Sequence, residues 1–155
     1  MDLRYTKIFF LFAIIFLLSC NRKSIPSSSK VNYLTSKDGS ITMRSIGIGE
    51  NQEAAIADAE KNAFDVLFFR GLPESEQKIA LIDTDEIKEK QKHQSYFENF
   101  YKYKRYKTFL MSSIPVASLT NIKGGLKSIA VDIKINITAL RKDLEQNDII
   151  RKFGY

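Results

Sequence analysis

ITMRSIGIGENQEAAIADAEKNAFDVLFFRGL, residues 41–72, holds the most regular pattern in this chain of 155 residues. Residues 41–48 alternate loosely and predict a strand, and Gly47 and Gly49 allow a tight exit from it. The following residues predict an amphipathic helix over Asn51–Arg70, with Asn51 as N-cap. Its apolar face is formed by Ala55, Ile56, Ala59, Ala63, Val66 and Leu67. The small alanines let a helix approach a sheet closely. The charged residues lie away from this face: Asp58, Glu60, Lys61 and Asp65.

A second regular pattern is GGLKSIAVDIKINITAL, residues 124–140. Strict alternation predicts a strand with one buried face, and therefore an antiparallel sheet. The buried positions are Ile129, Val131, Ile133, Ile135 and Ile137. Residues 105–120 are the expected partner strand, with Gly124-Gly125 as the turn. Leu140 and Leu144 predict a short helix near the end of the chain.

The predicted fold class is α+β. We expect an antiparallel sheet of three or four strands with one long amphipathic helix packed across one face, all in a single domain over residues 41–155. A further helix is expected from Asp83, which could cap it with Glu86 three residues on. That helix begins polar and becomes aromatic towards Tyr101.

The first twenty residues resemble an export signal of the lipoprotein type. Arg4 and Lys7 precede eleven apolar residues, Ile8 to Leu18, too few for a membrane span. Leu17-Leu18-Ser19-Cys20 resembles the lipobox of bacterial lipoproteins, in which the cysteine is acylated and becomes the first residue. We therefore predict a signal peptide at 1–19, lipidation of Cys20 (palmitate among the acyl chains), and a flexible lipid-anchored tether at 20–40. No acidic run follows Cys20, which favours the periplasmic face of the outer membrane.

Residues 47–63, GIGENQEAAIADAEKNA, preceded by a strand and a lipobox, are similar to the LPP20-like lipoprotein family. They are also similar to the N-terminal domain of the flagellar assembly protein FlgT. Both have a G-x-G turn followed by an alanine-rich helix on a small antiparallel sheet. The resemblance covers about a third of the mature domain. It implies an envelope-associated protein without catalytic activity and supplies no catalytic residues.

Three classes of function follow from the remaining residues. The first is a structural or assembly protein that docks other envelope proteins through its apolar end, at Ile149, Ile150, Phe153 and Tyr155. The alternative for this end is that it packs on its own domain. The second is a module that binds peptidoglycan or another anionic polymer through Tyr101, Lys102, Tyr103, Lys104, Arg105 and Lys107. The third, an enzyme, would use carboxylates such as Asp83, Asp85 and Glu86, which are more often helix caps than catalysts.

Composition narrows these classes. The formal net charge is +6, which suits anionic neighbours as well as plain solubility. One histidine and one cysteine exclude a zinc site of the usual type. We predict no metal and no cofactor, and no enzymatic activity because the candidate carboxylates fit helix caps better. Aromatic and basic residues alternate over 97–111, as in platforms for single-stranded nucleic acid. An exported protein meets little nucleic acid, so we interpret 97–111 as a strand with an aromatic face on the core.

Overall fold

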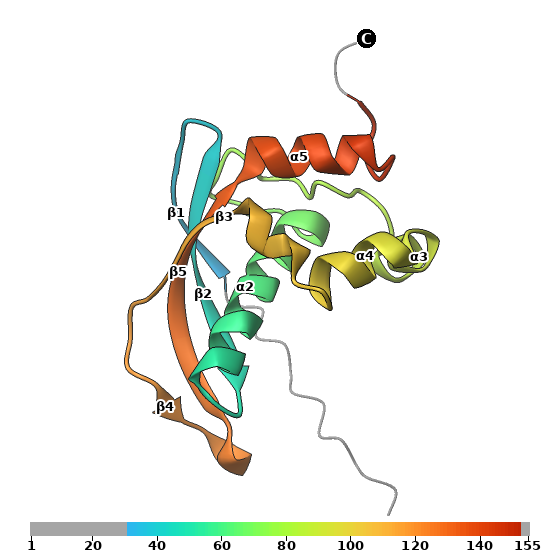
Figure 1. Cartoon of the computed structure of the whole chain (residues 1–155). Helices are drawn as coiled ribbons and strands as arrows, with labels where there is room; N and C mark the ends of the chain where they lie inside the picture. The colour runs from blue at the N-terminus through green and yellow to red at the C-terminus, as the bar shows by residue number, and fades with distance from the viewer. Residues whose placement is uncertain (1–30, 153–155) are drawn as a thin grey trace, which may run out of the picture.

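The computed structural model describes residues 31–152, which form an α+β fold (Figure 1). Within this range five strands make one antiparallel sheet: β1 (Val31–Lys37), β2 (Ser40–Gly49), β3 (Leu110–Pro115), β4 (Thr120–Asn121) and β5 (Lys127–Asn136). Four α-helices are α2 (Gln52–Phe69), α3 (Glu86–Lys92), α4 (Gln94–Tyr101) and α5 (Ile137–Gln146). Two short 3-10 helices are η1 (Arg105–Phe109) and η2 (Lys123–Gly125). The α+β class with an antiparallel sheet is as predicted, and the sheet has one strand more than the three or four expected.

The sheet has the order β1-β2-β5-β3, and β4 also pairs with β5. The predicted tether was wrong over residues 31–40, because β1 pairs with β2 from Val31 opposite Ser45 to Lys37 opposite Ser40. Asp38 and Gly39 join the two strands with φ of 49° and 70°. Positive φ at both central residues is typical of a two-residue hairpin turn, for which Asp-Gly is a preferred sequence. The hairpin signal was therefore present in the chain.

Helix α2 packs closely on β2 and β5, and the glycines of β2 make this approach feasible. A Cβ on Gly47 would lie 1.9 Å from the Ala55 carbonyl oxygen, and one on Gly49 would lie 2.4 Å from the Ala55 amide nitrogen. Ala55, Ala59 and Ala63 are fully buried in this contact. The two glycines thus serve the close approach of a helix to a strand, rather than the exit from the strand that their spacing indicated.

Two polar side chains of α2 form hydrogen bonds with backbone groups of β2 that β1 does not reach. β2 extends beyond the pairing with β1, which stops at Ser45. There the Ile48 amide donates to Asp58 Oδ2 at 2.9 Å, and Asn62 Nδ2 donates to the Ile46 carbonyl at 3.2 Å. Burial raises the pKa of Asp58, and the hydrogen bonds that its carboxylate accepts from the Ile48 amide and from Asn62 Nδ2 (3.2 Å) oppose the rise. The prediction that Asp58 lies on a solvent-facing side of α2 is wrong, because its carboxylate accepts a hydrogen bond from β2 where β1 no longer pairs with that strand.

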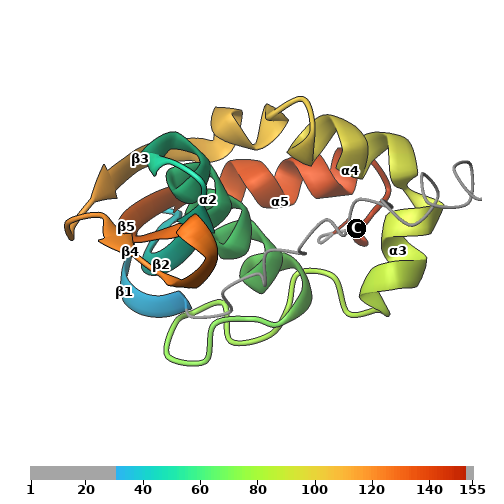
Figure 2. The same ribbon diagram turned by 90° about the horizontal axis from the view of Figure 1, so that it is seen from below.

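Aromatic rings fill the space between α2, α4 and η1. Phe64 and Phe100 meet edge to face at 5.2 Å between centroids, and Phe68 lies 5.1 Å from Phe100. Tyr106 of η1 is fully buried against Phe64. The strand interpreted over residues 97–111 was wrong, because α4 continues to Tyr101 and β3 begins only at Leu110. Figures 1 and 2 show the helices gathered on one side of the sheet.

Candidate functional site

The basic and aromatic stretch from Tyr101 to Lys107 is built into the fold instead of forming a free platform. Tyr101 ends α4, and its hydroxyl donates to Asp65 Oδ1 of α2 at 2.5 Å. Lys102 pairs with Glu98 one turn earlier, at 2.7 Å. Tyr103 is 66% exposed, and Lys104 holds a left-handed backbone with φ of 57° just before η1. Of the six predicted ligand-binding residues, Tyr103 presents the most open ring.

Lys107 joins η1 to a buried acid of α2. Its Nζ lies 2.6 Å from Glu60 Oε2, and Glu60 is only 1% exposed. The Tyr106 hydroxyl also donates to Glu60, at 3.3 Å. Burial and the neighbouring carboxylate raise the pKa of Tyr106. The prediction that Glu60 lies on the solvent face of the helix is wrong, because Glu60 is buried and the half-exposed Lys107 neutralises it.

Arg105 makes the corresponding contact with α5. Its guanidinium pairs with Asp143, and the Tyr96 hydroxyl of α4 donates to the same carboxylate at 2.7 Å. Arg105 also lies over the Tyr96 ring, 5.5 Å from its centroid. Burial, then the hydrogen bond to Asp143, raise the pKa of Tyr96. Three elements are thus joined through one carboxylate, and this role accounts for the position of Arg105.

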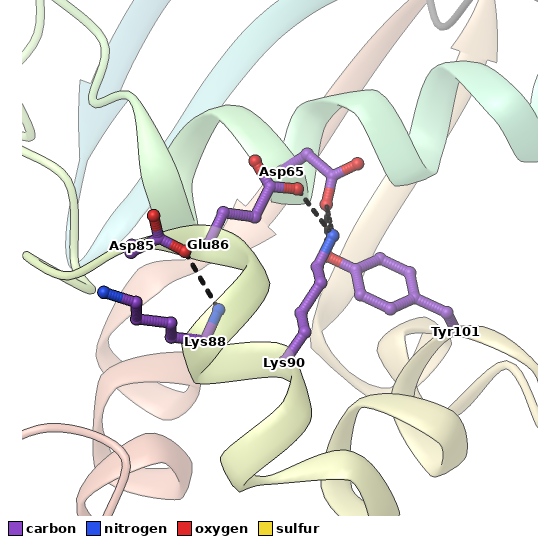
Figure 3. Close-up of polar contacts among 6 residues, drawn as sticks. All are labelled: Asp65, Asp85, Glu86, Lys88, Lys90 and Tyr101. Atoms are coloured by element: carbon purple, nitrogen blue, oxygen red, sulfur yellow. Dashed lines mark hydrogen bonds and ion pairs between the residues drawn. The ribbon is translucent and has the colours of Figure 1, made fainter.

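The predicted carboxylate group is also structural (Figure 3). Asp85, and not Asp83, caps α3 and accepts from the Lys88 amide at 3.0 Å. Glu86 accepts from Lys90 at 2.8 Å, and Lys90 also lies 3.5 Å from Asp65. Figure 3 shows Lys90 beside the Tyr101 ring, with a centroid distance of 5.3 Å. These contacts attach α3 to α2 and α4.

A polar hollow of about 560 Å³ lies where α3, α4, η1 and α5 meet. His93 separates α3 from α4, and α4 begins without a side-chain cap. His93 Nε2 lies 3.2 Å from Glu89 Oε1, in a direction that makes no hydrogen bond. The side chains that line the hollow are hydrogen-bonding groups without a carboxylate: Lys92, His93, Gln94, Ser95, Tyr96, Asn99, Arg105 and Asn147. Such a lining suits a polar or anionic group.

Sequence reasoning found Arg105 of this hollow and missed most of its other members. Lys92, His93, Asn99 and Asn147 come from three elements and share no spacing in the chain. The available signal was the polar run before Tyr96, in which His93 is the one histidine of the sequence. The sequence predicts only an exposed helix start for that run.

The predicted docking segment is partly core. Ile149 is 9% exposed, and its amide donates to the Leu144 carbonyl at 3.0 Å, so of the two alternatives for this end, packing on its own domain holds at Ile149. Ile150 is half-buried against the same core. Phe153 and Tyr155 lie outside the described residues, and so does Cys20.

Two findings concern the described residues, and three comparisons concern the whole chain. Over residues 31–152, none of the helices has both the length and the apolar character that crossing a membrane requires. The same residues include no group of three or more side chains suited to hold a metal ion. No protein-family model matches the chain, and no match was found among curated proteins or among solved structures.

Proposed function

We propose that this chain is a lipid-anchored protein of the bacterial cell envelope that works without catalysis, through contacts with other envelope proteins. The observation that carries the proposal is Leu17-Leu18-Ser19-Cys20, placed directly after eleven apolar residues. Two or more acyl chains on Cys20 would hold the domain stably at a membrane, because each buried methylene contributes about 0.8 kcal/mol. The outer membrane, on its periplasmic face, is the proposed location.

The use of charged side chains supports a non-catalytic role. The carboxylates that sequence reasoning offered as catalysts cap or pair within the fold, as Asp85 and Glu86 do. The deeply buried Glu60 is neutralised by Lys107, and Asp143 by Arg105. Each of these groups therefore has a structural task in the fold. The similarity of residues 47–63 to LPP20-like lipoproteins points in the same direction.

A second candidate function is the binding of peptidoglycan or another anionic envelope polymer. The hollow at the junction of α3, α4, η1 and α5 favours it, because Lys92 and Arg105 contribute cations and Asn99 and Asn147 contribute amides. Arg105 is already paired with Asp143, so Lys92 and the amides would carry the recognition.

Anchoring is tested by metabolic labelling with a palmitate analogue in cells that express the full chain. The Cys20→Ser chain should lose the label, and it should be found either uncleaved or as a soluble exported protein. Ser19→Ala, which keeps a small residue before the cysteine, is the matched control and should remain labelled. Normal labelling of the Cys20→Ser chain would show that the anchor lies elsewhere.

The two candidate functions are separated by what the anchored protein captures. Crosslinking in native membranes should recover defined envelope proteins with the parent chain. Lys92→Glu should leave that recovery unchanged, whereas it should weaken sedimentation with purified peptidoglycan if the hollow binds polymer. Lys88→Glu, on the exposed surface of α3, provides a control of equal charge. Unchanged sedimentation in both variants would exclude the hollow as the polymer site.

A further inference from the structure

The face of the sheet away from the helices is the most distinctive uncovered surface of the described residues (Figures 1 and 2). Strand register places Ile46 opposite Ala130 and Arg44 opposite Asp132 on this face. The β3 residue Ile114 also lies opposite Asp132. The Val116 amide donates to the Ala130 carbonyl, and the Ile122 amide donates to the Leu126 carbonyl. We name the apolar part of this surface the open face: Ile46, Ile48, Ile114, Val116, Ile122, Leu126 and Ala130.

Several of its members are well exposed for their type. Ile114 is 57% exposed, Val116 42% and Ile122 36%, and Met111 beside them on β3 is 56% exposed. Single exposed apolar residues are ordinary on a protein surface, but several on or directly beside paired strands indicate an interaction surface. The packing of α2 does not need these side chains, because it uses the other side of the same strands.

The charge around the open face is basic. Of the six lysines and arginines in residues 99–131, Lys123 and Lys127 border this face, and the other four lie at the end of α4 and at η1, on the helix side of the sheet. Asp132, the acid beside Ile114, is neutralised by Arg44 through two hydrogen bonds of 2.7 and 2.9 Å. Lys123 and Lys127 lie at the end of the β4–β5 hairpin, next to Ile122 and Leu126. Apolar side chains rimmed by lysine match the chemistry of an anionic lipid surface.

A lipid anchor on Cys20 would keep this face close to a membrane. Val31 pairs with Ser45, so the chain enters the sheet beside Ile46 of the open face. The stretch from Cys20 to Val31 spans at most roughly 40 Å even if fully extended. The ten-residue strand β5 is itself about 34 Å long. An acylated Cys20 would therefore keep the whole open face within reach of the bilayer.

We propose that the open face lies against anionic bilayer headgroups, with Ile122 and Val116 at the acyl boundary and Lys123 and Lys127 on lipid phosphates. This inference rests on the proposed anchoring through Cys20. It adds an orientation, in which the helices and the polar hollow face away from the membrane. A second copy of the chain, or a protein partner, would compete for the same face and is separated by the experiment below.

The test measures amide hydrogen exchange of the acylated full-length product, purified from membranes and reconstituted in vesicles. Vesicles of phosphatidylcholine alone are compared with equal parts of phosphatidylcholine and phosphatidylglycerol. Exchange over residues 111–126 should be slower in the anionic vesicles, and residues 74–80, around the 73% exposed Ile79, should not change. Each lysine near such a surface favours the docked state about fivefold, so Lys123→Glu with Lys127→Glu should abolish the protection. Lys88→Glu with Lys142→Glu is the charge-matched control and should retain it.

Each outcome bears on the inference. Acylated protein with equal exchange in both vesicles overturns the orientation and leaves anchoring intact. Protection that appears in phosphatidylcholine alone and grows with protein concentration overturns it in favour of a second copy. Protection that requires an added envelope protein overturns it in favour of a partner. Mass spectrometry of the same sample reports the acyl chains, and their absence from Cys20 would refute the proposed function together with the inference.

Discussion

Gly47→Ala should be among the most damaging single-methyl additions in this domain. The new Cβ would lie 1.9 Å from the Ala55 carbonyl oxygen and 2.4 Å from the Ala59 amide nitrogen. Heavy atoms need about 3.5 Å, so α2 would have to retreat by more than 1 Å along its contact with β2. Overpacking of this kind costs about 1–3 kcal/mol, and a contact with backbone atoms belongs at the upper end, because no side chain can rotate away.

Urea denaturation followed by circular dichroism measures the effect on a chain of residues 20–155 carrying Cys20→Ser. We expect a loss of about 3 kcal/mol for Gly47→Ala. Gly125→Ala is the control, because its Cβ meets nothing within 4 Å and only the φ of +77° is unfavourable. Its cost should be about 1–2 kcal/mol. Ala59→Gly should not rescue Gly47→Ala, since the nearest atom belongs to the backbone of Ala55. Equal losses for the two glycine variants would refute the described approach of α2 to β2.

Three further measurements address the charges, the tyrosines and the chain end. Lys107→Ala should cost about 2 kcal/mol in urea denaturation, because it strands the carboxylate of Glu60, and adding Glu60→Gln should recover much of the loss. The fold raises the pKa of Tyr96, so the stability that its protonated hydroxyl contributes is complete below the unfolded pKa near 10 and is lost as the pH rises above it. The free energy of unfolding, measured across that pH, should fall less steeply in Tyr96→Phe than in the parent chain. Ile149→Ala should lower stability by about 2 kcal/mol, whereas Ile79→Ala, 73% exposed, should have almost no effect; equal melting temperatures for these two variants would contradict the placement of Ile149.

The regular elements were predictable because their patterns are local. The alternation of residues 129–135 marked β5, and the cap at Asn51 placed the start of α2 correctly. The residues 105–120 expected to pair with β5 do contain β3. The first hairpin was missed although Asp38-Gly39 signalled it, because a serine-rich composition before it favoured a tether.

The candidate site was less predictable because its contacts are distant in the chain. Basic residues interleaved with aromatic residues fit a strand, a binding platform or a helix equally well. The deciding facts are Glu60 and Asp143, which receive Lys107 and Arg105 from α2 and α5. Neither acid is near these cations in sequence, and Glu60 carries no local mark of burial. The carboxylate caps are a milder case, because Asp83 and Asp85 both satisfy the rule for an N-cap and only the backbone shows which is used.

The central pair of the sheet has a kinetic consequence. β2 and β5 pair residues 40–49 with residues 127–136. The core can therefore form only when the long loop between these strands, which is most of the domain, has closed. Contacts of such separation slow folding, because the entropy of loop closure is lost before the contacts form. A chain made from its N-terminus has β2 and α2 long before β5 exists. During synthesis the apolar face of α2 therefore has β2 but not yet β5 to pack against. Until β5 has been made, the domain stays open enough to pass through a narrow channel.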